Sequence, residues 1–194
     1  MRRIYQSGDH LGDVAVLKVT LFSNGDAPGP YTEKILARRA ENFTRIDLDQ
    51  LAALPPGSFG HEYSRFMRRN GLRPFNFSDR VAALFDTFPV STRYVRIHDM
   101  VHVLLGFEPD IPGELGVYAF VGEQHYNPTL DRAALTARFF AAFMFWSRSK
   151  MRAARLRGKA LARGARILIA EPLEDMLERP LAEVRRELGL AADS

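Results

Sequence analysis

The stretch HDMVHVLLGFEPDIPGELG, residues 98–116, predicts two helices joined by a short turn, and this hairpin decides the fold. Helix-forming residues run up to Gly106, a residue type that commonly ends helices. After the loop, Pro112 and Gly113 open a second helical segment. The same stretch holds two histidines four residues apart and two nearby carboxylates. It therefore reads either as a metal site or as an ordinary helix hairpin.

The spacing of the four polar residues favours one common site. If residues 92–105 are helical, His98 and His102 lie on one face, one turn apart. Asp99 lies about 100° around the helix from His98 but three residues before His102, so the three share one quadrant. Glu114 falls in the first turn of the next helix, which an antiparallel hairpin returns toward the histidines. Two imidazoles and two carboxylates suit zinc, iron or a related divalent ion.

The spacing alone leaves a second interpretation open. An isolated His-x-x-x-His pattern also occurs in helices that bind no metal. In that case His98 is a buried core histidine, and Asp99 is its hydrogen-bond partner.

Length and composition limit the classes of protein. The chain has 194 residues, of which 46% are apolar and 26% charged, which suits one globular domain over residues 1–194. It has no cysteine, so a metal must be held by nitrogen and oxygen ligands. The first residues lack a targeting-peptide pattern, and no apolar run reaches about 18 residues. We therefore expect a cytoplasmic protein.

The helical patterns predict an all-α, single-domain fold with the metal site on a helix hairpin. Ser58 is the expected N-cap of one helix, and Ser91 or Thr92 of another. Residues 14–22 fit a helix or a strand equally well. The other segments expected to be helical are 28–43, 47–58, 55–74, 131–164 and 171–190, the last split at Pro180.

Positive charge is concentrated in one part of the chain. From Arg132 to Ala170 there are ten Arg and Lys residues and no Asp or Glu. The segment lacks interleaved aromatic residues, so we expect a membrane surface and no nucleic acid as its partner. The apolar run at 139–146 is expected to be a core helix, or else the wall of a ligand tunnel or a patch that dips into lipid.

The run RYVRIHDMVHVLLGFEPDIPGELGVYAFVGEQ resembles the signature of a known family, the ubiquinone (coenzyme Q) biosynthesis proteins represented by the fourth protein of the coenzyme Q series. That signature is His-Asp-x-x-His, eleven residues and Glu, which His98, Asp99, His102 and Glu114 match.

The resemblance is strongest over residues 47–190, where LPPGSFGHEYSRFMRRNGLRP and the closing EPLEDMLERPLAEVRRELGL are also similar to the family. Met100 and Val101 depart from its pattern, which has Leu and an aromatic residue there. These departures change the packing beside the site and leave its ligands intact.

The resemblance implies a divalent metal, usually zinc, on those four residues. It also implies a prenylated quinone precursor as substrate, other ubiquinone-biosynthesis proteins as partners, and a place peripheral to the bacterial inner membrane. The implied reaction is oxidative decarboxylation of a polyprenylated benzoate at ring carbon one. A homodimer is expected because dimers are the commonest oligomers.

Two other functions remain open. One is a non-catalytic, lipid-binding scaffold for the pathway enzymes with a structural metal, since four protein ligands close a tetrahedral zinc site. For a catalytic zinc one ligand must move, and Glu114, on a separate helix, is the expected one. The other is a metal-dependent phosphohydrolase, with His61 and Asp131 as outer ligands and no role for Glu114.

Overall fold

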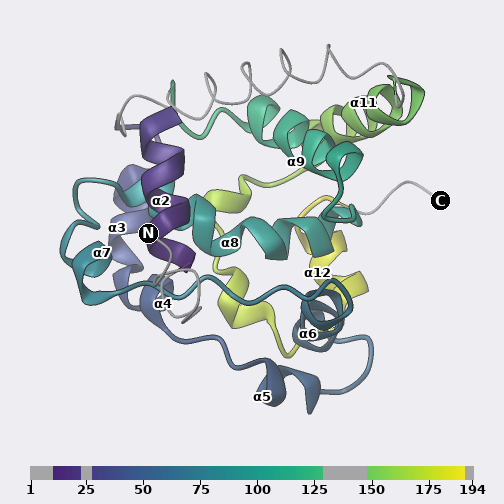
Figure 1. Cartoon of the computed structure of the whole chain (residues 1–194). Helices are drawn as coiled ribbons and strands as arrows, with labels where there is room; N and C mark the ends of the chain where they lie inside the picture. Colours follow the sequence, from purple (N-terminus) through teal and green to yellow (C-terminus); the bar gives the residue numbers. More distant parts are fainter. Residues whose placement is uncertain (1–10, 23–27, 129–147, 191–194) are drawn as a thin grey trace.

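The computed structural model describes residues 11–22, 28–128 and 148–190, and it is all-α, as predicted (Figure 1). Within these ranges there is no strand, only a single bridge between Ser58 and Pro180. The helices are α2 (Leu11–Phe22), α3 (Thr32–Ala37), α4 (Arg39–Phe43), α5 (Leu48–Ala52), α6 (Phe59–Arg69), α7 (Asp79–Ala83), α8 (Pro89–Leu105), α9 (Ile111–Gln124), α11 (Arg148–Gly164), the 3-10 turns η2 (Leu168–Ala170) and η3 (Leu173–Met176), and α12 (Leu181–Glu187).

The central helix is α8, which the other helices surround in Figure 1. It begins at Pro89, so the predicted N-cap at Ser91 or Thr92 is wrong. Proline fixes the helical φ and gives up an N–H that has no partner in the first turn, and so it favours this start. The predicted end is confirmed, because Gly106 adopts a left-handed conformation with φ 65°.

The second helix of the hairpin is α9, which returns beside α8 (Figure 1). The Asp110 carboxylate accepts a hydrogen bond from the Gly113 amide at 2.8 Å and so caps the helix start. The helix begins at Ile111, one residue before the predicted Pro112. The hairpin predicted from the sequence is therefore confirmed, with a loop of five residues.

The remaining predictions are mostly confirmed. Ser58 caps α6 by accepting from the His61 amide at 3.3 Å, and the ambiguous residues 14–22 belong to helix α2. The C-terminal helical segments are split at Pro180. Helix α11 matches the last part of the predicted helix 131–164. The first part, with the apolar run at 139–146, lies outside the described residues.

Two arginines hold the C-terminal end of α8. Arg157 of α11 donates to the carbonyl oxygens of Leu105 at 2.6 Å and Gly106 at 3.2 Å. Arg185 of α12 donates to those of Leu104 at 2.9 Å and Val103 at 2.8 Å. Positive charge at this end is favourable because the unpaired helix carbonyls carry partial negative charge. The turn that follows His102 is thereby tied to two other helices.

Glycines allow α9 and α11 to approach closely. Gly158 of α11 lies against the carbonyl of Gly116 in α9, and a Cβ atom at Gly158 would overlap that oxygen. A Cβ atom at Gly116 would lie 2.5 Å from the Phe107 ring. The Arg157 guanidinium covers the same ring at 4.4 Å. This packing fixes both the loop of the hairpin and the first turn of α9.

Candidate metal centre

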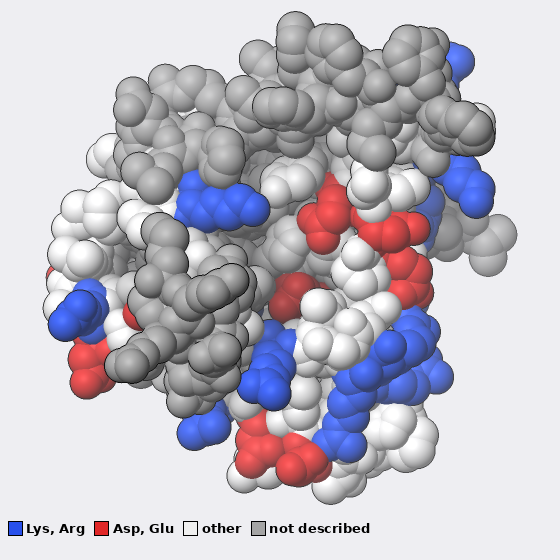
Figure 2. Space-filling model, in the orientation of Figure 1, with Lys and Arg blue, Asp and Glu red and all other residues white. Residues whose placement is uncertain are grey.

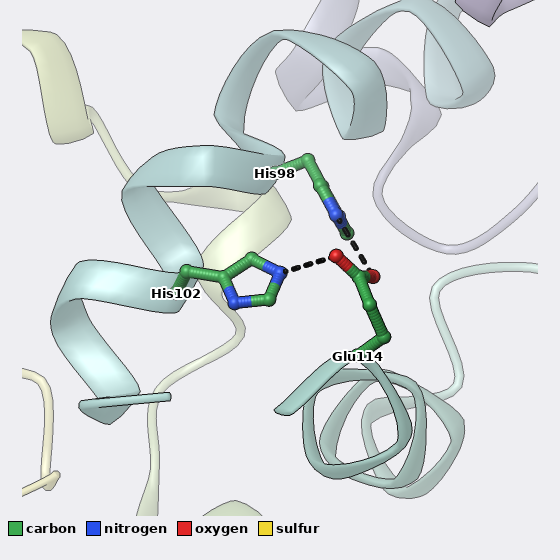
Figure 3. Close-up of side chains that lie close together, drawn as sticks. All are labelled: His98, His102 and Glu114. Atoms are coloured by element: carbon green, nitrogen blue, oxygen red, sulfur yellow. Dashed lines mark ion pairs between the residues drawn. The ribbon is translucent and has the colours of Figure 1, made fainter. Parts of the chain in front are cut away.

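Three of the four predicted ligands meet between α8 and α9, as Figure 3 shows. The Nε2 atom of His98 lies 3.3 Å from Glu114 Oε2. The Nε2 atom of His102 lies 3.2 Å from Glu114 Oε1. One ligand atom from each residue can be chosen so that all lie within 4.8 Å of one another. The helical register and the hairpin together produce this cluster, as the sequence predicted.

The surroundings of the cluster are largely apolar. The His102 side chain is fully buried and stacks on Phe66, with ring centroids 6.0 Å apart. His98 is 16% exposed and Glu114 is 35% exposed, so solvent reaches the cluster from the α9 side. Tyr94 lies edge-on to His98 at 5.4 Å. The histidines are therefore held in fixed orientations by rings of the core.

The hydrogen-bonding of His102 tests whether these residues suit a cation. Its Nδ1 atom lies 3.3 Å from the carbonyl oxygen of Phe107, which can only accept, so Nδ1 carries the proton. In the neutral ring Nε2 then holds a lone pair, and it faces a Glu114 oxygen without making a hydrogen bond. Two acceptors facing each other require a proton or a metal ion between them. The donor set fits a divalent ion.

The charges of the cluster also suit a cation. Burial by itself raises the pKa of Glu114, but the contacts and charges of His102 and His98 outweigh it and hold that pKa far below its ordinary value. Burial lowers the pKa of His98, and the contact with Glu114 more than reverses this, so the net shift is upward. Glu114 is thus a carboxylate, ready to bind, at every physiological pH.

Asp99 is buried beside the cluster but does not join the three-residue group. Burial raises the pKa of its carboxyl, and the charges of His98 and His102 partly oppose the rise. Side chains of adjacent helical residues point about 100° apart, so the Asp99 side chain points in a different direction from that of His98. The structure thus places two histidines and one carboxylate together, with a second carboxylate alongside.

In metal-free protein, we expect the His98–Glu114 contact to stabilise the fold most between pH 4.5 and 6.5, the ordinary pKa values of the two groups. The lowered pKa of Glu114 adds stability above pH 4.5, and this stability is lost as the pH falls toward the pKa of Glu114 in the folded protein. The raised pKa of His98 adds stability below pH 6.5, and this stability is lost as the pH rises through the pKa of His98 in the folded protein. Urea unfolding with chelator, of wild type and Glu114→Gln, measures the difference. A difference that does not vary with pH would contradict the linkage.

Sequence reasoning missed two parts of the site. Tyr94 precedes His98 by four residues, and this helical spacing could have identified it. The Phe107 carbonyl that orients His102 gives no sequence signal, because a backbone atom has no residue type. Tyr118 and His125 follow Glu114 by four and eleven residues, a spacing that predicts one helical face, where they could contact a ligand residue, face the substrate or simply pack. Tyr118 is half-buried near Glu114, which adds to a rise in the Tyr118 pKa caused mainly by burial, whereas His125 is exposed at the end of α9.

Of the two outer ligands of the alternative phosphohydrolase set, the structure describes only His61. His61 lies 3.4 Å from Glu62 in α6 and is not part of the three-residue group. Asp131 lies outside the described residues.

Known proteins that are similar to this chain belong to one family. Residues 28–193 match the family described as coenzyme Q (ubiquinone) biosynthesis protein Coq4. The human mitochondrial ubiquinone biosynthesis protein COQ4 homolog is 32% identical over 171 residues, which cover 84% of this chain and 62% of the human protein. The zebrafish (Danio rerio) homolog is 28% identical over 190 residues, covering 94% and 67%. The chain thus spans roughly two thirds of these relatives.

A solved structure has a similar fold. It is the crystal structure of a putative ubiquinone biosynthesis protein from Nostoc punctiforme, with a TM-score of 0.63 and 22% sequence identity. The similarity covers 93% of this chain and 82% of the Nostoc chain. At this identity the comparison shows a shared fold.

Proposed function

Because the chain belongs to the Coq4 family of coenzyme Q (ubiquinone) biosynthesis proteins, we propose that it acts on a polyprenylated benzoate or quinone precursor at a divalent-metal centre. The observation that carries the proposal is the orientation of His102. Its Nδ1 proton is directed to the Phe107 carbonyl, and its Nε2 lone pair is directed at the Glu114 carboxylate. Such an arrangement is typical of histidines that bind metal.

His98, His102 and Glu114 would hold the ion, and zinc is the metal we propose. Three protein ligands leave a position for substrate, which is typical of catalytic sites, whereas structural sites have four. A metal ion bound there would stabilise negative charge on a benzoate oxygen. We propose that Asp99, the carboxylate beside the cluster, turns toward the ion and becomes a fourth ligand in the absence of substrate. An open position then does not require Glu114 to move.

Tyr94 is the residue that we propose to orient the substrate. Its hydroxyl is buried and has no hydrogen-bond partner among the described residues, although the ring contacts His98. Burial, with smaller effects of Tyr118 and Glu114, holds the pKa of Tyr94 well above its ordinary value, so the hydroxyl keeps its proton. A buried hydroxyl without a partner costs about 1–3 kcal/mol, which a bound carboxylate or phenolate oxygen would recover. Tyr94 therefore donates to an oxygen of the substrate.

The proposed reaction replaces the carboxylate at ring carbon one with a hydroxyl group and releases carbon dioxide. It removes two electrons from the substrate, so the assay must supply an oxidant, such as dioxygen. We expect zinc-loaded protein to release labelled carbon dioxide from a farnesylated para-hydroxybenzoate, and Glu114→Gln to abolish the release. Tyr94→Phe should retain its metal and bind the substrate roughly 10- to 100-fold more weakly, as expected for loss of a hydrogen bond to a charged group.

The same experiment separates catalysis from a scaffold role. Tight binding of the prenylated benzoate without release of carbon dioxide, under several oxidants and metals, would contradict the enzyme and favour a lipid-binding scaffold with a structural metal. Normal binding and release by Tyr94→Phe would remove Tyr94 from the proposal and leave the metal ligands unaffected.

We also propose that α11 contacts an anionic membrane surface. Lys150, Arg152 and Arg163 are exposed on this helix and make no ion pair with any described residue, and Leu156 among them is 52% exposed. No helix in the described parts of the chain is long and apolar enough to cross a bilayer. A basic helix with an exposed leucine suits attachment to headgroups, at about 1 kcal/mol per basic residue.

Basic side chains of α6 differ from those of α11 because they have acidic partners. Figure 2 shows basic residues gathered over the end of the molecule where α6 lies. Two arginines of α6 are neutralised, because Arg65 pairs with Glu62 and Arg68 with Asp49. The charge available for lipid is therefore greater on α11.

Vesicle sedimentation tests the membrane proposal. We expect vesicles containing phosphatidylglycerol, but not pure phosphatidylcholine, to bind the protein. Arg152→Glu with Arg163→Glu should reduce the bound fraction at least about tenfold, given roughly 1 kcal/mol per basic residue. Arg80→Glu, an exposed residue of α7, is the matched control and should bind normally. Equal binding of the double variant and the control would exclude α11 as the helix that contacts the membrane.

We further propose contacts with other pathway proteins, a homodimer and a place at the inner membrane.

A further inference from the structure

A hollow of about 240 Å³ lies on the side of α8 opposite the metal cluster. Arg96 belongs to its lining and precedes His98 by two residues, which places it about 200° around the helix from His98. The hollow is lined by Asn42, Phe43, Arg45, Asn76, Phe77 and Arg96. None of these is acidic. We refer to it as the Arg96 hollow.

Arg96 joins the two walls of the hollow. Its guanidinium donates to the Thr44 carbonyl on one wall and, at 3.5 Å, to the Phe75 carbonyl on the other. The Phe43 and Phe77 rings also meet edge to face, with centroids 5.7 Å apart. The walls are therefore held at a fixed separation, and the hollow is a built feature of the fold.

Arg96 is a buried cation that lacks full compensation. It is 3% exposed, and its Nε atom makes no hydrogen bond within the described parts of the chain. It forms an ion pair with Glu174, whose carboxylate lies 3.6 Å from that Nε. Glu174 also pairs with buried Arg93, at 2.5 Å. One carboxylate thus serves two buried guanidinium groups, and a net positive charge remains.

Arg45 adds a second available cation. It lines the hollow, is exposed, and makes no hydrogen bond or ion pair with any described residue. A neighbouring hollow of about 420 Å³ shares Arg45 and Arg96, but Asp47, Glu174 and Glu178 also line it. Those carboxylates would repel an anion. The Arg96 hollow, in contrast, offers two guanidinium groups, an amide and two aromatic rings.

We propose that the Arg96 hollow binds a small aromatic carboxylate, a second ligand site separate from the metal centre. The carboxylate lies between Arg45 and Arg96, which suit oxyanions, and the Asn76 amide supplies a further donor. The ring of the ligand packs against Phe43 and Phe77. The volume is below the roughly 300 Å³ at which pockets for drug-sized ligands begin, so the ligand is a single-ring molecule.

Calorimetric titration of the full chain with benzoate tests this site. A chelator must be present, because a carboxylate would otherwise also bind a metal at His98 and His102. We expect one benzoate per chain, with acetate and inorganic phosphate at least about tenfold weaker, because neither gains the contacts with the two rings. Arg45→Glu should weaken benzoate binding at least about tenfold, and Arg45→Lys should retain part of it.

The controls separate this site from the metal centre. Arg152→Glu removes an exposed arginine elsewhere, and Glu114→Gln alters only the metal cluster, so both should bind benzoate as wild type does. Unchanged affinity in Arg45→Glu would overturn the proposal, as would phosphate binding as tight as that of benzoate. Loss of binding in Glu114→Gln would likewise assign the ligand to the metal centre. Arg45 is exposed, so its variants should fold, which the unchanged thermal midpoint would verify.

Discussion

Purified wild-type protein is expected to carry about one divalent metal ion per chain, and His102→Ala is expected to lose it. His102 supplies a fully buried nitrogen whose orientation is fixed by Phe107. Changes to residues that merely orient a ligand weaken metal binding about 10- to 100-fold, so removing the ligand itself should cost more than about 100-fold. Elemental analysis after dialysis measures the metal content, and competition with a chromophoric chelator gives the affinity.

Two further variants make this result interpretable. Replacing His102 leaves a cavity in the core, so loss of metal there could follow from lost packing. Glu114→Gln preserves size and shape at a half-exposed position and should lose the metal while keeping the fold. His61→Ala changes a histidine outside the cluster and should bind metal normally. Full metal content in Glu114→Gln would show that the three-residue cluster is not the site.

Gly158→Ala is expected to destabilise the protein by about 1–3 kcal/mol or more, the usual cost of overpacking a core. Alanine within a helix ordinarily gains up to about 1 kcal/mol over glycine, so propensity alone predicts the opposite sign. The clash decides, because the added Cβ atom would overlap the Gly116 carbonyl, a backbone atom that cannot rotate away. Urea unfolding of metal-free protein measures the change in free energy.

The matched control lies in the same helix. A Cβ atom at Gly164 would lie 3.6 Å from its nearest neighbour, an ordinary contact, so Gly164→Ala should be neutral or slightly stabilising. Because Gly116 is two residues from Glu114, moving α9 away from α11 should also weaken metal binding in Gly158→Ala. Equal stability of the two variants would mean that α9 and α11 can separate without cost.

The hairpin and most of the cluster could be predicted because both depend on local rules. The four-residue step from His98 to His102 fixes their common face, and Gly106 and Pro112 mark the turn that brings Glu114 back. Asp99 was grouped with them from sequence position. Its side chain stands apart because adjacent helical residues diverge by about 100°.

Contacts between distant segments could not be predicted. Arg93 and Glu174 are 81 residues apart and meet only because the C-terminal 3-10 turns pack against α8. The same is true of Arg157 and Arg185 at the end of α8. Single residues of common type carry no signal of such pairing, so the Arg96 hollow became visible only in the folded chain.

The burial of α8 has a kinetic consequence for the metal centre. Every residue of α8 except His98 is buried, so its amide hydrogens should exchange with solvent only when the whole domain opens. Helix α5, with no buried residue, should exchange by local opening. A bound ion therefore leaves along the side of Glu114, the ligand most exposed to water. Fluctuations of the first turn of α9, rather than of the histidine helix, should set how long the metal stays.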